Sequence, residues 1–142
     1  FKTVYCPGEL EAISYDLTGH EIARSSLKTA SEETVLTVLP EDSVISADGQ
    51  DLAYIQVLVT DPGGIAKMLD EHAIAVEVTG AGTLAAVGSG NPVTEESFTG
   101  SSYTTYQGRM IAIVRSNGEQ GKIRVKVSSE GLQNREVVLE AR

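Results

Sequence analysis

Apolar and polar residues alternate with a period of two along most of this chain. Six short segments rich in β-branched residues carry the signal: 34–42, 52–61, 73–80, 109–116, 122–129 and 134–141. In KIRVKVSS, residues 122–129, the aliphatic side chains fall on one face and the basic side chains on the other. RMIAIVRS, residues 109–116, is apolar on both faces, which is typical of a central strand. This alternation predicts β-strands that each bury one face or both.

Turn residues separate these segments. They occur at Asp48-Gly49, Asp61–Gly64, Gly80–Gly82, Asn117-Gly118 and Glu130-Gly131. The spacing of about 8–12 residues between strand signals is typical of an antiparallel sandwich. Only GIAKMLDEHA, residues 64–73, leans toward a helix, and a loop with one helical turn fits it equally well. No long helices separate the strands, so the pattern predicts an all-β, immunoglobulin-like antiparallel β-sandwich.

The first part of the chain is expected to be separate from this sandwich. Residues 1–28 contain two strand segments joined at Leu17-Thr18-Gly19, which predicts a β-hairpin. Residues 29–33 are small and polar and form the expected linker, and the sandwich is expected to occupy residues 34–142. A lone hairpin is marginally stable in water. We therefore expect it to pack on the sandwich, on a second copy of the chain, or on an upstream domain.

Composition narrows the choice of partners. Among 142 residues, 20 are acidic and 11 are basic, which gives a formal net charge of −9. Such a surface repels phosphate backbones and disfavours nucleic acid as a partner. No apolar run reaches the roughly 20 residues of a membrane span, and Cys6 is a lone cysteine without a disulfide partner or a metal cluster. The chain begins with Phe rather than Met, so we expect a fragment of a longer protein, and the lack of a signal peptide carries no information on the parent.

The sequence predicts no catalytic residue. Glu95 and Glu96 are adjacent within the loop GSGNPVTEESFTG, residues 88–100, and neighbours on an extended chain point to opposite faces, so they make a poor catalytic pair. His20 and His72 lack the nucleophile elbow of a serine hydrolase. The loop also lacks the lysine of a phosphate-binding loop and a helix to follow it. We expect an ordered connector between two strands.

Two weaker candidates concern metal and sugar. Asp48, Asp51 and Asp61 lie in turns but lack the spacing of a calcium loop, so no metal site and no cofactor are predicted. Tyr103 and Tyr106 lie in a polar stretch beside the loop 88–100. A loop conformation would bring them together as an aromatic platform for sugar, whereas half-buried tyrosines covering a sheet edge are the simpler alternative.

Longer stretches carry a resemblance to a known family. YCPGELEAISYDLTGHEIARSSLKTA, residues 5–30, resembles the end of the immunoglobulin-like domain that follows the catalytic barrel in bacterial family 2 glycoside hydrolases of the β-galactosidase type. LPEDSVISADGQDLAYIQVLVTDPGG, residues 39–64, resembles the opening of the next, C-terminal immunoglobulin-like domain. Residues 76–100 and 106–132 continue the same pattern. The SADGQDLAYIQV piece also resembles bacterial adhesin repeats.

The resemblance implies a non-catalytic accessory domain of a glycosidase. The catalytic glutamates would lie on an upstream barrel, and no position of this chain matches them. The implied partners are the barrel and immunoglobulin-like domains of the same parent, with a homo-oligomer through the hairpin as a further possibility, and the implied location is bacterial, periplasmic or secreted. A cell-surface adhesin module and a carbohydrate-binding module are the alternatives.

Overall fold

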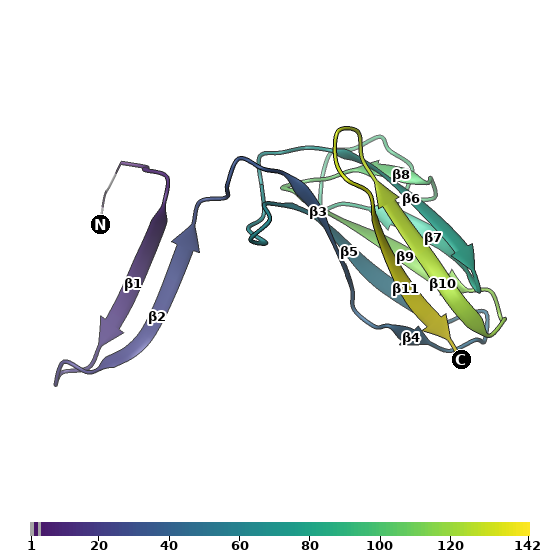
Figure 1. The fold of residues 1–142 in the computed structure, drawn as a ribbon, viewed down its shortest axis with the longest axis horizontal. Coiled ribbons are helices and arrows are strands. Elements are labelled where there is room, and N and C mark those ends of the chain that lie inside the picture. Colours follow the sequence, from purple (N-terminus) through teal and green to yellow (C-terminus); the bar gives the residue numbers. More distant parts are fainter. Residues whose placement is uncertain (1, 3) are drawn as a thin grey trace.

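The computed structural model describes residue 2 and residues 4–142, and its regular structure consists entirely of strands (Figure 1). In chain order these are β1 (Glu9–Tyr15), β2 (Glu21–Lys28), β3 (Val35–Pro40), β4 (Val44–Ile45), β5 (Leu52–Thr60), β6 (Ala73–Gly80), β7 (Gly82–Gly88), β8 (Ser102–Thr104), β9 (Arg109–Ser116), β10 (Gly121–Ser128) and β11 (Arg135–Ala141). The prediction of an all-β fold is confirmed.

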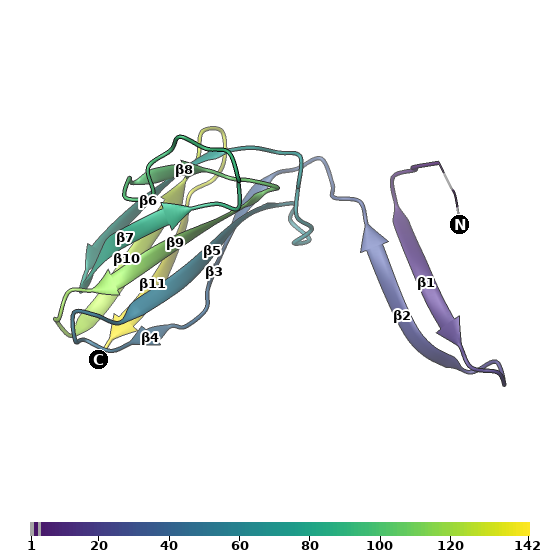
Figure 2. The ribbon, with the colours of Figure 1, turned by 180° about the vertical axis from the view of Figure 1, so that it is seen from behind.

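The strands form one hairpin and one sandwich. β1 and β2 pair with each other, β3-β5-β9-β7 form a four-stranded sheet, and β4-β11-β10-β6-β8 form a five-stranded sheet. The two larger sheets lie face to face, whereas the hairpin stands apart from them at the far end of a short connection, as both views show (Figure 1, Figure 2). The predicted sandwich preceded by a hairpin is therefore confirmed.

The core lies between the two larger sheets because the strands alternate buried and exposed residues, as in β5 and β10. The buried apolar side chains form one cluster: Leu36, Ile45, Ala53, Ile55, Val57, Val59, Ile74, Val76, Ala81, Val87, Tyr103, Met110, Ala112, Val114, Ile123, Val125, Val127, Leu139 and Ala141. None of them belongs to the hairpin. The sandwich thus has its own core, to which the hairpin contributes nothing.

Three details differ from the sequence prediction or extend it. The pair β4–β11 is parallel, because the chain leaves the four-stranded sheet after β3 and crosses to the edge of the other sheet. β7 and β8, which flank the loop 88–100, carry weaker alternation. Residues 64–72 form turns and irregular structure rather than a helix, residue 73 begins β6, and a backbone bridge between Thr60 and Ala66 folds this segment back on β5. One amphipathic turn is too short to form a stable helix without tertiary support.

Candidate functional site

The loop between β7 and β8 is an ordered connector in the structure. The Phe98 ring stacks on the Tyr103 ring, with centroids 5.5 Å apart and an interplanar angle of 20°. Phe98 also covers Gly88, where an added Cβ would lie 3.1 Å from the ring, and the Val87 N–H donates to the Phe98 carbonyl at 2.8 Å. The aromatic pair and this hydrogen bond hold the loop against the end of β7 and the start of β8.

The carboxylates of this loop do not form a catalytic pair. The Glu96 Oε1 atom accepts hydrogen bonds from the Thr104 N–H at 2.9 Å and from the Thr104 hydroxyl at 3.0 Å. Glu95 is exposed and makes no side-chain hydrogen bond among the described residues. Glu96 therefore fixes the end of the loop to β8, which is a structural role.

The two tyrosines predicted as a sugar platform are not presented together. Tyr103 is 0% exposed and belongs to the core of the sandwich, because β8 pairs with β6 in a register that points this ring inward. Tyr106 is half-buried beside Gly90. The Tyr103 ring offers no exposed face for a sugar, so the placement of an aromatic platform at Tyr103 and Tyr106 needs correction.

The histidines lie in two unrelated places. His20 lies in the hairpin turn, where its Nδ1 is 2.8 Å from the Thr18 hydroxyl. His72 precedes β6, and its Nδ1 is 3.5 Å from the Ser129 hydroxyl, which instead donates to the Ala73 carbonyl at 3.0 Å. The hydroxyl proton of Ser129 thus points at the backbone oxygen of Ala73. A nucleophile activated by His72 would need that proton directed at the imidazole.

The turn aspartates serve as acceptors for backbone N–H groups. The Asp48 carboxylate accepts from Gln50 and Asp51, and the Asp51 carboxylate accepts from Ser46 and Leu52. These N–H donors favour the charged form and hold the pKa of both carboxyl groups below the usual range. Within residues 2 and 4–142, no group of three or more Asp, Glu, His or Cys side chains could hold a metal ion.

The linker between hairpin and sandwich is held by two residues of the loop that follows β5. The Asp61 carboxylate accepts the Ser31 N–H at 2.9 Å and the Ile65 N–H at 2.8 Å. The Lys67 ammonium donates to the Glu32 carbonyl and to the Thr34 hydroxyl, both at 2.7 Å. We call Asp61, Lys67 and residues 31–34 the linker clamp. It fixes the direction in which the chain leaves the sandwich.

The sequence indicates a turn at Asp61 and gives no signal for the role of Lys67. A local signal exists for Asp61, since an aspartate before Pro62-Gly63 is typical of a turn. The contact with Ser31, thirty positions away, has no signature in the sequence. Long-range side-chain contacts of this kind depend on residues 61–67 folding back along β5. This folding-back could not be predicted, because the sequence of residues 64–73 fits a helix and a loop equally well.

Acid is expected to weaken the linker clamp. The backbone donors at Ser31 and Ile65 lower the pKa of Asp61 from its ordinary value of about 3.9, so folding favours the charged carboxylate. This contribution to stability is complete above the ordinary pKa and is lost as the pH falls through the lower pKa of the folded state. We expect cleavage at residues 29–34 by a pepsin-type protease, measured relative to an unfolded peptide of the same sequence, to rise as the pH falls below about 3.9.

Asp61→Asn should show fast linker cleavage, relative to the same unfolded peptide, both above and below about pH 3.9, because the neutral amide is a weaker acceptor for the two N–H groups. Asp42→Asn is the matched control, since the Asp42 side chain has no hydrogen-bond partner within the described chain. Its cleavage should follow the wild-type pH profile. A wild-type linker whose cleavage relative to the unfolded peptide does not change with pH would contradict the assigned role of Asp61.

The hairpin has two dissimilar sides. One side carries ion pairs: Glu9 with Lys28 at 3.3 Å, and Arg24 with Glu11 at 2.8 Å and with Glu21 at 2.9 Å. The other side, which we call the apolar side, places Leu10 directly opposite Leu27. Leu10 is 61% exposed and Leu27 is 72% exposed, so this side is uncovered in the chain.

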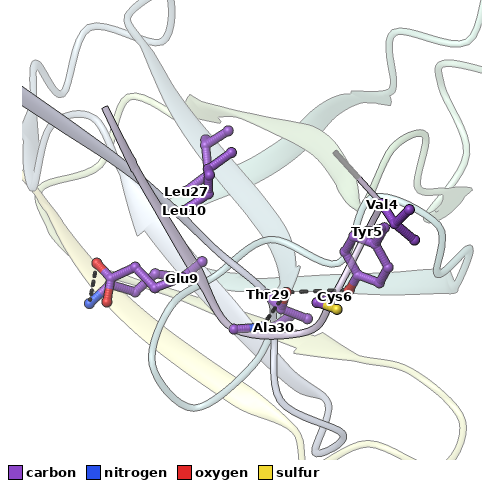
Figure 3. Close-up of a pocket in the computed structure, with 10 residues that line it drawn as sticks. Val4, Tyr5, Cys6, Glu9, Leu10, Leu27, Thr29 and Ala30 are labelled. Carbon is purple, nitrogen blue, oxygen red and sulfur yellow. Dashed lines mark hydrogen bonds and ion pairs between the residues drawn. The ribbon is translucent and has the colours of Figure 1, made fainter. Parts of the chain in front are cut away.

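The apolar side continues into an open hollow near the start of the chain. Its volume is ≈ 480 Å³, and Tyr5, Cys6, Leu10, Leu27 and Ala30 are among its lining residues. In Figure 3 Leu10 and Leu27 lie together, whereas the Glu9 side chain points away from them. The Tyr5 hydroxyl lies 3.3 Å from the Thr29 hydroxyl, which joins the N-terminal segment to the end of β2. The lining also includes Glu9 and Lys28, which pair with each other at 3.3 Å.

The fold defines the class of protein, an immunoglobulin-like β-sandwich module with a preceding hairpin on a clamped linker. Among the described residues no helix is long and apolar enough to cross a bilayer. The chain belongs to the family described as glycoside hydrolase family 2 C-terminal domain 5, whose model matches residues 36–138.

Relatives of known sequence and structure agree with this assignment. The chain is 30% identical over 133 residues to the β-galactosidase BoGH2A of Bacteroides ovatus, covering 94% of this chain and 16% of that protein. A crystal structure of a glycosyl hydrolase family 2 member from Bacteroides cellulosilyticus matches 99% of this chain and 18% of its own, with 31% identity and a TM-score of 0.94. A β-glycosidase from Bacteroides vulgatus shares the fold, with 20% identity, a TM-score of 0.87 and coverage of 96% and 18%. The chain thus spans less than a fifth of these proteins.

Proposed function

We propose that this chain is a non-catalytic, accessory C-terminal domain of a larger glycoside hydrolase of the β-galactosidase type. The observation that carries the proposal is the family match over residues 36–138 together with the small share of each relative that the chain covers. The parent would hydrolyse terminal β-galactosides or related glycosides with carboxylates that lie outside this chain. The module would contribute stability and placement rather than chemistry.

The proposal extends to the domain boundaries. Residues 1–28 would complete an upstream domain, residues 29–33 would be the linker, and residues 34–142 would form the C-terminal domain. The uncovered apolar side supports this division, since a hairpin that exposes Leu10 and Leu27 gains stability when a neighbour covers them. The upstream domains of the same polypeptide are the neighbour at the highest effective concentration.

The linker clamp would hold the two domains at a fixed angle. Residues 34–142 make up about three quarters of the chain, so a TM-score of 0.94 over 99% of the chain requires the hairpin to superpose together with the sandwich. A freely swinging linker would not preserve that relation at 31% identity. The contacts of Asp61 and Lys67 supply a physical reason for the shared geometry.

Two truncations of the parent test the function and the boundary together. Removal of residues 34–142 should leave hydrolysis of a nitrophenyl β-galactoside intact, because the hairpin still completes the upstream domain. Removal of residues 1–142 should cause aggregation or a large loss of activity, because it strips the hairpin from that domain. The isolated chain should hydrolyse nothing and give no calorimetric heat with galactosides.

Hydrolysis by the isolated chain would contradict the accessory role. Equal behaviour of the two truncations would contradict the boundary near residue 28 while leaving the accessory role standing. An upstream region without any glycosidase activity would contradict the proposed parent. Each result therefore bears on a different part of the proposal.

A further inference from the structure

Two large apolar side chains are exposed side by side in the loop between β5 and β6. Met68 is 57% exposed and Leu69 is 96% exposed, and we call these two residues the loop tip. In both views this loop projects beside the linker, at the end of the sandwich nearer to the hairpin (Figure 1, Figure 2). The loops at the opposite end, residues 41–43, 46–51 and 117–120, consist of small, polar and acidic residues. The two ends of the sandwich therefore differ in character.

The backbone on both sides of the loop tip is fixed to the sandwich. Before the tip, the Lys67 N–H donates to the Val59 carbonyl at 2.9 Å, and the Lys67 carbonyl lies so close to Gly108 that an added Cβ there would come within 2.6 Å of it. After the tip, the His72 N–H donates to the Thr105 hydroxyl and the Thr105 N–H donates to the His72 carbonyl, both at 2.9 Å. A surface held in place before binding loses less entropy when a partner covers it.

The N-terminal segment of the chain reaches the same linker. The Thr29 N–H donates to the Gly8 carbonyl at 2.8 Å, and the Tyr5 hydroxyl lies 3.3 Å from the Thr29 hydroxyl. From the other direction, the Lys67 ammonium, next to the loop tip in sequence, donates to the Glu32 carbonyl. The segment that leads into β1 and the loop that carries the tip are thus both bound to the short stretch of residues 29–34.

This arrangement favours the upstream domain as the partner of the loop tip. The hairpin is proposed to complete that domain, and the superposition with the relative from Bacteroides cellulosilyticus requires a shared placement of hairpin and sandwich. The upstream domain then occupies a fixed place next to the linker. Because it belongs to the same polypeptide, its contact with the loop tip is effectively intramolecular, whereas a second copy of the chain has no such advantage.

We propose that the loop tip packs into an apolar recess of the upstream domain, beside the hairpin that completes it. The inference rests on the proposed function, because it requires that domain. Burial of the two side chains removes apolar surface from water and stabilises the contact. The sandwich is then held to its neighbour at two points, by the linker clamp through hydrogen bonds and by the loop tip through apolar packing.

Hydroxyl-radical footprinting of the full-length parent and of the 142-residue chain tests this contact. The chain is a suitable reference because its sandwich has a core of its own. Radicals convert accessible methionine to the sulfoxide, and we expect the oxidation of Met68 and Leu69 to fall several-fold in the parent. Met110, which is 4% exposed, should stay unreactive in both proteins and reports unfolding. Val44, which is 43% exposed at the opposite end of the sandwich, should react equally in both.

Two variants of the parent sharpen the test. Leu69→Asp would bury a charge in the recess, so it should restore the oxidation of Met68 to the level of the 142-residue chain. Val93→Asp is the matched control, since Val93 is 84% exposed in the loop after β7, at the opposite edge of the four-stranded sheet from β3. It should leave the protection of Met68 in place. The wild-type comparison stands without variants, should Leu69→Asp fail to fold.

Equal oxidation of Met68 in the parent and in the 142-residue chain would overturn the contact. Protection that appears only at high concentration, together with a doubled mass in light scattering, would overturn it in favour of a second copy. Hydrolysis of the nitrophenyl galactoside is measured on the same samples. An active parent with an unprotected loop tip rejects the contact alone, whereas an inactive parent rejects the proposed function.

Discussion

Replacing Gly80 with alanine is expected to destabilise the sandwich severely. Gly80 ends β6 with a φ of +93°, a region that costs other residues about 1–2 kcal/mol. An added Cβ would also overlap the Lys122 carbonyl oxygen, closer than real Cβ atoms approach other atoms. That oxygen accepts the Ala81 N–H, so relief of the overlap would break the β6–β10 pairing. We expect a loss of about 3 kcal/mol or more in the free energy of unfolding, measured with urea.

Gly118→Ala is the matched control for this variant. Gly118 has nearly the same backbone, with a φ of +88°, but no atom lies within 4 Å of the added Cβ. Its cost should be the conformational cost alone, about 1 kcal/mol. Equal losses for the two variants would show that the close approach of β6 to Lys122 contributes nothing to stability.

Replacing Ile55 with alanine should cost about 2–5 kcal/mol in the free energy of unfolding. Ile55 is 0% exposed on β5, which lies between β3 and β9 in the four-stranded sheet. The truncation removes buried apolar surface and leaves a cavity that the paired strands on both sides prevent from collapsing. Urea unfolding monitored by circular dichroism measures the loss.

Leu27→Ala removes a comparable side chain from the hairpin and serves as the comparison. In the 142-residue chain its cost should stay within about 0.5 kcal/mol, as for other surface changes. In the parent the same variant should cost several times more, since the upstream domain is proposed to cover the apolar side. A parent that tolerates Leu27→Ala as easily as the isolated chain does would contradict that packing.

The sandwich could be predicted because most of its strands carry a local sequence pattern that is typical of β-structure. β5, β6, β10 and β11 each bury one face, so their sequences alternate, and β9 is a continuous apolar run bounded by polar residues. Glycine and aspartate in the turns add a second, independent signal. When the alternation within the strands and the turn residues between them agree, the fold class can be predicted without long-range information.

The position of single side chains could not be predicted in the same way. Tyr103 lies on a three-residue strand, so its inward direction depends on the pairing of β8 with β6 and not on any alternation of its own. β4 has two residues, too few for a period. A strand that is apolar on both sides, such as β9, has the sequence of a fully buried central strand, so the sequence could not show that Ile111 and Ile113 are only half-buried.

The order of the strands has a consequence for synthesis on the ribosome. β11 lies between β4 and β10, pairing with both. Until residues 135–141 have left the exit tunnel, β4 has no neighbour and the five-stranded sheet has a gap that exposes its aliphatic inner surface. The nascent sandwich therefore completes its folding only at the end of translation of this segment, and chaperones that recognise exposed apolar strands have their best opportunity in that interval.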